Sequence, residues 1–299
     1  MINQRCAISN DTNIFICGDY APVRSFDFKQ ILKLLKEEDY LIINYEGVDQ
    51  SIDSGLKKFD YYTPLINNDL LTFLVDKKIK LLANFCNNHT LDYGTEGLNY
   101  TIRQLKNIGV ICFGLNYPGI YQKIEFVDNK NNIYEINSLI DSNLIKHYRK
   151  FNYQKFFNTY KNVSKLKLQK SSIIYFHGGI EFINYPNYCL YKKLEYFNKK
   201  GINCFVSHQH VPLLLSINQT ISCFGLGNLA FDYKNHNHTP HTKNSYVFKL
   251  NSKFKLSDIY FSNYKYRVLN FEKYPDLNNK FPKFSFTEWS KECYLLKQR

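Results

Sequence analysis

Short apolar runs recur along the chain, separated by segments whose leucines and isoleucines lie three to four residues apart. The runs are nearly continuous in apolar, β-branched or aromatic residues, as expected of strands buried on both faces. They cover residues 13–17, 40–44, 79–85, 110–113, 173–176, 202–207 and 221–224. The segments with helical spacing cover residues 28–35, 68–76, 97–106 and 188–199. This alternation of strand and helix predicts an α/β architecture.

Two parts of the chain depart from the alternation. Residues 123–137 predict a β-hairpin that turns at 128–132, and the basic, aromatic residues 151–162 predict a helix. The chain from residue 245 indicates antiparallel strands, followed by a final helix at 284–297. No shift in composition marks a domain boundary. We therefore expect one domain over residues 1–299, with a motif-bearing core at 13–232 and a β-rich and helical extension at 246–299.

Composition and charge are those of an ordinary globular protein and do not identify a binding partner. The chain is 44% hydrophobic and 22% charged, which is ordinary for a globular protein. Its net charge of +13 would attract anionic partners such as phosphorylated metabolites, acidic polymers or nucleic acid, but the charge alone is better explained by a solvated lysine-rich surface. Eight cysteines occur without a CxxC pair, so no disulfide framework is expected. We see no secretory signal and no membrane-spanning segment, which predicts a cytoplasmic protein and leaves its oligomeric state open.

Polar and ionisable residues directly follow six of the predicted strands. These strand ends read Gly18-Asp19, Asn44-Tyr45-Glu46-Gly47, Asn87-Asn88-His89, His177-Gly178-Gly179-Ile180-Glu181, His208-Gln209-His210 and Gly225-Leu226-Gly227-Asn228. In open α/β sheets, ligands bind outside the carboxyl ends of the strands. The six strand ends are therefore expected to converge if their strands are neighbours.

The pair His208-x-His210 is the sharpest local signal for a metal site. In an extended backbone, residues two apart point the same way with Cα atoms about 6.6 Å apart, so both imidazoles could reach one ion or two adjacent ions. Two unrelated histidines are the alternative, because the pair alone is a weak signal. Together with the other strand-end donors it forms a mixed nitrogen and oxygen set suited to Mn, Fe, Zn, Co or Ni, and the absence of thiolates argues against a structural zinc site.

The motifs also occur in a recognisable order: GD…R, NYEG, NNHTLDYG, HGGIEF, SHQHV and GLGNLAFD. This order resembles the CapA family of poly-γ-glutamate and capsule synthesis proteins, which belongs to the calcineurin-like metallophosphatases. The resemblance runs from Phe15 to about Asp232, and residues 121–171 are too divergent to align. It implies a four-layer α/β/β/α metallophosphatase-like sandwich that holds one or two divalent transition-metal ions. The ligands it implies are Asp19, Glu46, Asn88, His177, His208 and His210, with Glu46 as the bridge between two ions.

The resemblance further implies the residues that act on a substrate. His89 corresponds to the catalytic histidine beside the ligand asparagine, and Arg24 to an arginine that could grip an anionic substrate group. Asp92 either orients His89 or caps the next helix. Glu181 and Asn228 are candidates for holding ligand histidines, with a simple turn residue as the alternative for Asn228.

This sequence departs from the family pattern in three ways, one of which is a short segment between the NNH and HGG blocks. Asp19 is followed by Tyr20 and Ala21 rather than by the histidine of the general D-x-H signature, so one metal position lacks a nitrogen ligand and a single ion is a further option. The membrane anchor or export signal of many relatives is also not found. Each departure weakens the prediction of a capsule role more than it weakens the prediction of the metal site.

The function predicted from these residues is metal-dependent hydrolysis. The substrate expected is a small anionic or sugar-phosphate metabolite, whose phosphorus is attacked in line by a metal-bound hydroxide while His89 stabilises or protonates the leaving oxygen. One alternative is a capsule or surface-polymer protein that acts on an acidic polymer by hydrolysis or transfer. Another is a noncatalytic metal-binding module.

Two further features were weighed as sites. The histidines His236, His238 and His241 are interpreted as part of a surface loop, because no carboxylate or strand accompanies them. The basic aromatic residues 146–170 could hold single-stranded nucleic acid, but their spacing also suits a buried face, which we favour. No specific nucleic-acid motif occurs.

Overall fold

Two large mixed sheets form the centre of the computed structural model, which describes residues 3–27, 29–52, 63–161, 168–169, 171–183, 187–217, 220–232, 240–265 and 268–273. The seven-stranded sheet has the order β1 (Asn3–Ala7), β8 (Lys123–Val127), β9 (Ile133–Ile140), β10 (Ser172–His177), β11 (Asn203–Ser207), β13 (Ile221–Leu226) and β12 (Pro212–Ile217). The eight-stranded sheet has the order β17 (Val268–Lys273), β16 (Leu256–Lys265), β15 (Asn244–Leu250), β2 (Ile14–Ala21), β3 (Tyr40–Tyr45), β6 (Lys80–Asn84) and β7 (Ile111–Phe113), with β14 (Asn228–Phe231) also paired to β2. A small separate sheet joins β4 (Val48–Asp49) to β5 (Leu65–Ile66).

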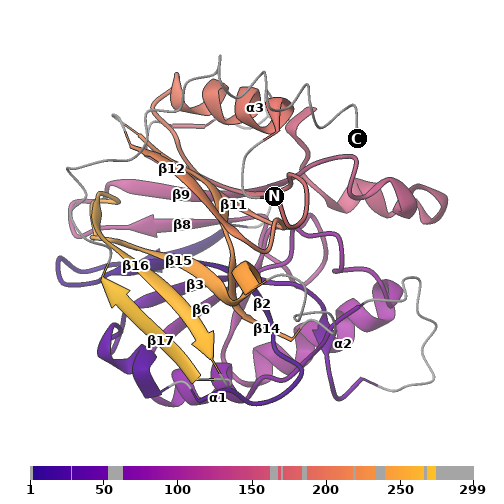
Figure 1. The fold of residues 1–299 in the computed structure, drawn as a ribbon, viewed down its shortest axis with the longest axis horizontal. Helices are drawn as coiled ribbons and strands as arrows, with labels where there is room; N and C mark the ends of the chain where they lie inside the picture. Colours follow the sequence, from indigo (N-terminus) through magenta and orange to yellow (C-terminus); the bar gives the residue numbers. More distant parts are fainter. Residues whose placement is uncertain are drawn as a thin grey trace.

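Helices lie on the outer faces of these sheets (Figure 1). They are α1 (Asp69–Asp76), α2 (Gly94–Asn107) and α3 (Tyr188–Asn198), with short 3-10 helices η1 (Lys29–Lys33), η2 (Lys146–Phe151), η3 (Tyr153–Phe156) and η6 (Pro240–Lys243). The predicted α/β class is thus confirmed, and the three α-helices match predicted segments. Residues 28–35 differ, because only the short η1 forms there.

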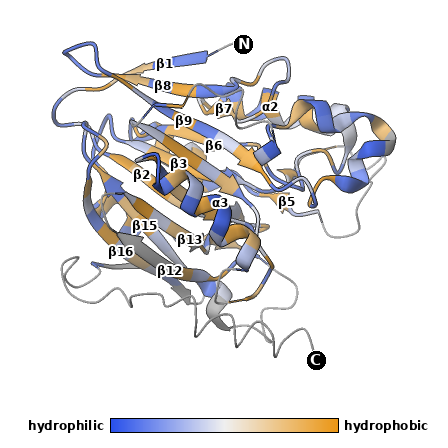
Figure 2. Ribbon diagram, turned by 90° about the horizontal axis from the view of Figure 1, so that it is seen from above, coloured by the Kyte–Doolittle hydropathy of each residue, from blue (hydrophilic) through white to orange (hydrophobic). Residues whose placement is uncertain are grey.

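The apolar residues pack in three clusters, which explains why the strands read as continuous apolar runs. In β2, Ile14 and Ile16 pack between the two sheets, whereas Phe15 and Cys17 pack toward α1 and α2 on the other face. On the seven-stranded sheet, Ile174 and Phe176 of β10 likewise pack against α3. Both faces of the central strands are therefore buried, as their composition predicts. Figure 2 shows hydrophobic residues concentrated on these strands and a hydrophilic β1 at the margin.

The predicted hairpin and the C-terminal antiparallel strands are confirmed. β8 and β9 pair antiparallel, and Asp128 Oδ1 closes their turn by accepting the N–H groups of Lys130 and Asn132. β15, β16 and β17 pair antiparallel in sequence order. The predicted helix at 284–297 lies outside the described residues, as do His236 and His238, and His241 lies in η6.

The helix predicted at 151–162 is wrong. Asn152 has a left-handed backbone (φ 56°), which separates η2 from η3, and Phe157 is already extended. The favoured interpretation of the aromatic residues as packing residues is confirmed for Phe157, which is buried, and for Tyr153 and Phe156, which pack against the same core. Among the described residues, no helix combines the length and apolar character needed to cross a membrane.

Candidate metal centre

A β-bulge aims the first candidate ligand, Asp19, into the site. In the parallel pairing of β2 with β3, Ile16 is opposite Ile42 but Asp19 is opposite Asn44, so β2 carries one extra residue. Gly18 is needed in the bulge because a Cβ there would lie 1.8 Å from the carbonyl oxygen of Gly227. The buried Tyr175 hydroxyl donates to the carbonyl of Cys17, which satisfies the bulged backbone.

Asn44 is the central hydrogen-bonding residue of the site, and the sequence reasoning did not assign it a role. Its Nδ2 donates to Asp19 Oδ1 (2.8 Å), lies 3.4 Å from Glu46 Oε2 and lies 3.3 Å from His177 Nδ1. Its Oδ1 accepts hydrogen bonds from Asn84 and Asn87. A signal for it was present, because Asn44 and Glu46 are two apart at a strand end and so share a face.

The extended geometry expected for His208-x-His210 is wrong. Both histidines have left-handed backbones, with φ 92° at His208 and φ 58° at His210, because the chain bends sharply after β11. The bend is fixed by the N–H of His208, which donates to Asp19 Oδ2 (3.1 Å). His210 is held from the side, since its Nδ1 lies 2.9 Å from Asn228 Oδ1 and 3.3 Å from Asp19 Oδ2. Asn228 thus contacts a candidate ligand and is more than a turn residue.

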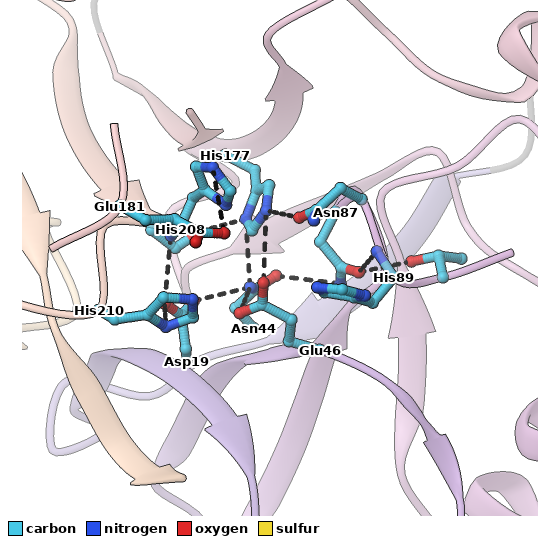
Figure 3. A network of polar contacts seen from close by, with 12 residues as sticks. Asp19, Asn44, Glu46, Asn87, His89, His177, Glu181, His208 and His210 are labelled. Carbon is cyan, nitrogen blue, oxygen red and sulfur yellow. Dashed lines mark hydrogen bonds and ion pairs between the residues drawn. The ribbon is translucent and has the colours of Figure 1, made fainter. Parts of the chain in front are cut away.

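Five of the six candidate ligands come together at the ends of strands from both large sheets (Figure 3), and the sixth, Asn88, contacts one of these five. Glu46, His208 and His210 each offer a donor atom, and these three atoms lie within 4.8 Å of one another. His177 Nε2 lies 3.7 Å from Glu46 Oε1 and 2.6 Å from Asn88 Oδ1. The ends of β2, β3 and β6 supply Asp19, Glu46 and Asn88 on one side of the cluster, and the ends of β10 and β11 supply the three histidines on the other.

The buried polar atoms of this cluster fit a bound cation. Glu46 Oε1 and His208 Nδ1 are buried and have no hydrogen-bond partner among the described residues. Burying such polar atoms lowers the stability of the fold unless a ligand such as a cation interacts with them. Burial raises the pKa of the Glu46 carboxyl well above its usual range, and repulsion from Asp19 and Glu181 adds to the shift. A divalent cation would offset that repulsion, and the donor set of carboxylate, amide oxygen and imidazole is one that transition metals accept. The structure therefore contains a candidate metal-binding site at Glu46, His208 and His210.

The histidines of the cluster differ in their electrostatic surroundings. Burial, followed by repulsion from neighbouring histidines, lowers the pKa of His177 and of His208 well below the usual value, so both imidazoles are neutral and able to act as ligands. Burial would also lower the pKa of His210, but the hydrogen bond and charge of Asp19 outweigh it and raise that pKa. Glu181, whose side chain is 38% exposed, has its Oε1 3.9 Å from His208 Nε2.

His89 lies beside the cluster and is oriented by Asp92. Its Nδ1 is 2.7 Å from Asp92 Oδ2, the same oxygen that accepts the hydroxyl of Thr63. Asp92 does not cap the following helix, since α2 begins after Tyr93 without a side-chain cap. Of the two roles considered for Asp92, the geometry therefore favours the orientation of His89. No sequence pattern pointed to Thr63 as a partner of Asp92.

Arg24 is the one candidate residue that the structure does not bring into the cluster. Its side chain is exposed, and its backbone N–H, like that of Val23, donates to Asp232 Oδ2 (3.1 Å). The loop after β2 is thus fixed by its backbone, which leaves the guanidinium at the surface.

The part of the chain that matches a known protein family contains three of the six candidate ligands. Residues 14–123 match the family model described as bacterial capsule synthesis protein PGA_cap, a region that includes Asp19, Glu46, Asn88, His89 and Asp92. No significant match was found among curated proteins. Over residues 14–123 the chain is thus similar to bacterial capsule synthesis proteins, which agrees with the family predicted from its motifs.

Proposed function

We propose that this chain is a metal-dependent hydrolase of the metallophosphatase type, a phosphoesterase that acts on a small anionic or sugar-phosphate metabolite. The observation that carries the proposal is the buried cluster in which Glu46 Oε1 and His208 Nδ1 have no hydrogen-bond partner among the described residues. Two large sheets with helices packed outside them are compatible with the four-layer α/β/β/α sandwich of that superfamily.

The candidate ligands for one or two divalent ions are Asp19, Glu46, Asn88, His177, His208 and His210. An ion of the Mn, Fe, Zn, Co or Ni type supplies Lewis acidity there and lowers the pKa of water. The protein contributes a low-dielectric site, since all of these side chains except Asn88 are buried, and charge interactions are stronger in such surroundings.

His89 is the group suited to proton transfer. Because Asp92 Oδ2 accepts the proton on Nδ1, the ring presents Nε2 to the site and can donate a proton from that atom to a leaving oxygen. The buried Asp92 carboxylate stabilises the imidazolium form that such donation requires. The exposed guanidinium of Arg24 could contact an anionic substrate group outside the cluster.

A second candidate function is supported by the family match. Capsule synthesis proteins handle surface polymers, so the same site could act on an acidic polymer by hydrolysis or transfer. The net charge of +13 is compatible with a polyanionic substrate.

Elemental analysis and a substrate panel test the proposal. Purified protein is stripped with chelator, reloaded separately with Mn, Fe, Zn, Co or Ni, and assayed on an aryl phosphate, a set of sugar phosphates and an acidic polymer. Asn88→Ala should lose metal and turnover together, whereas Asn99→Ala, on the exposed face of α2, should keep both. Turnover of the polymer alone would favour the second candidate. Wild-type protein that binds metal but turns over no substrate would point to the noncatalytic module.

A further inference from the structure

Tyr148 connects the region that does not align with the family to the His89–Asp92 pair. It lies in η2 and is fully buried. Its hydroxyl oxygen is 2.7 Å from Asp92 Oδ1 and 2.6 Å from the carbonyl oxygen of Asn88, and it accepts the N–H of Leu91 (3.2 Å). A single side chain thus contacts the backbone of a candidate ligand and the carboxylate that holds the candidate acid.

The hydroxyl has one proton and two acceptors, so it is shared between Asp92 Oδ1 and the Asn88 carbonyl. With Oδ1 engaged in this way, the other oxygen of Asp92 is directed to His89 and Thr63. Without the hydroxyl, Oδ1 of a fully buried carboxylate would lose this donor. An unpaired buried acceptor of this kind drives rearrangement, and the carboxylate could then rotate away from His89.

We infer that Tyr148 is a positioning residue for the His89–Asp92 pair, an inference that rests on the proposed function. It acts through Asp92 and does not itself touch substrate. Its phenol ring is fixed independently of the hydroxyl, because it stacks on Phe157 with ring centroids 5.9 Å apart at 6° and packs near Tyr153. Tyr148→Phe therefore removes the hydrogen bonds and keeps the packing.

The competing explanation is that the hydroxyl only fastens η2 to the turn at residues 88–91. Such a structural role would lower stability and disturb metal binding and turnover alike. A positioning role would lower kcat while KM and metal content stay unchanged. Loss of a hydrogen bond to a charged group corresponds to a fall in kcat of roughly 10- to 100-fold.

The test compares Tyr148→Phe with Tyr117→Phe, which deletes a hydroxyl that donates to Asn99 Oδ1 at an exposed site. Tyr148→Phe should lower kcat for the aryl phosphate as stated, and should add less than about 3-fold in an Asp92→Asn background, because both changes disable one unit. Tyr117→Phe should leave kcat unchanged. Additive effects of Tyr148→Phe and Asp92→Asn, or a joint loss of metal and turnover, would overturn the inference.

A second measurement does not depend on turnover. The Nδ1–H proton of His89 in its bond to Asp92 is followed by NMR in the full-length protein, assigned by its loss in His89→Gln. Tyr148→Phe should shift or broaden this resonance, and Tyr117→Phe should not. An unchanged resonance in Tyr148→Phe would refute the positioning role. Absence of turnover in the wild type would count against the proposed function alone.

Discussion

Replacing Glu46 by glutamine should separate the loss of folding stability caused by the buried carboxylate in metal-free protein from the stabilisation that metal binding provides. The change keeps the shape of a fully buried side chain and removes its charge. Burial raises the pKa of Glu46 in the folded chain, with further repulsion from Asp19 and Glu181. Below the unfolded-state pKa the carboxyl is protonated in both states, so it has no effect on stability there. Above that pKa only the unfolded state releases the proton, so the free energy of unfolding falls by roughly 1.4 kcal/mol per pH unit until the folded-state pKa is passed.

Glutamine does not titrate, so Glu46→Gln should become more stable than the wild type as pH rises above about 4.5 in metal-free protein. Two pH units within this window correspond to roughly 3 kcal/mol. At such a pH, metal should remove most of this difference, because wild-type protein at 100 times the dissociation constant gains about 2.7 kcal/mol while the neutral amide retains little affinity.

Urea unfolding followed by circular dichroism from pH 5 to 8, with chelator or with the ion found by elemental analysis, measures both effects. Glu37→Gln is the matched control, since Glu37 pairs with Lys78 where both side chains are 66% exposed, and its loss should change stability by less than about 1 kcal/mol. Parallel pH curves for wild type and Glu46→Gln in chelator, or equal stabilisation of both by metal, would refute the reasoning.

Three further changes test other parts of the structure. Asp92→Asn should lower kcat by at least about 100-fold with metal content retained, because an amide can stabilise the wrong tautomer of His89, and steady-state kinetics with elemental analysis check this. Gly18→Ala should destabilise the fold by about 1–3 kcal/mol or more in urea unfolding, because the added Cβ would lie 1.8 Å from a backbone oxygen; a wild-type midpoint would contradict the bulge geometry. Phe205→Ala should cost about 3–5 kcal/mol by the same assay, since the ring is buried between the two sheets against Phe248, and a loss below 1 kcal/mol would argue against that packing.

The sequence predicted the parts of the site that depend on strand ends. Asp19, Glu46 and His177 each lie at or just after a buried strand, and hydrophobic runs locate such strands well. Periodicity does not show that their strands belong to two different sheets, because the pairing of strands depends on contacts between residues distant in sequence. The role of Tyr148 was missed for the same reason, since it acts through partners distant in sequence. Tyr148 and Asp92, for example, are 56 residues apart.

The geometry of His208 and His210 illustrates why local patterns fall short. Left-handed φ at a residue other than glycine costs of order 1–3 kcal/mol, so no local preference selects it twice within three residues. Contacts with residues distant in sequence offset this backbone strain. The N–H of His208 donates to the Asp19 carboxylate, and the ring of His210 contacts that same carboxylate and Asn228. Hydrogen bonds to charged groups contribute about 1.5–3 kcal/mol, enough to hold the bend. Asp19 is therefore both a candidate ligand and the acceptor that shapes the backbone of two others, so the bulge that positions Asp19 also determines where both imidazoles lie.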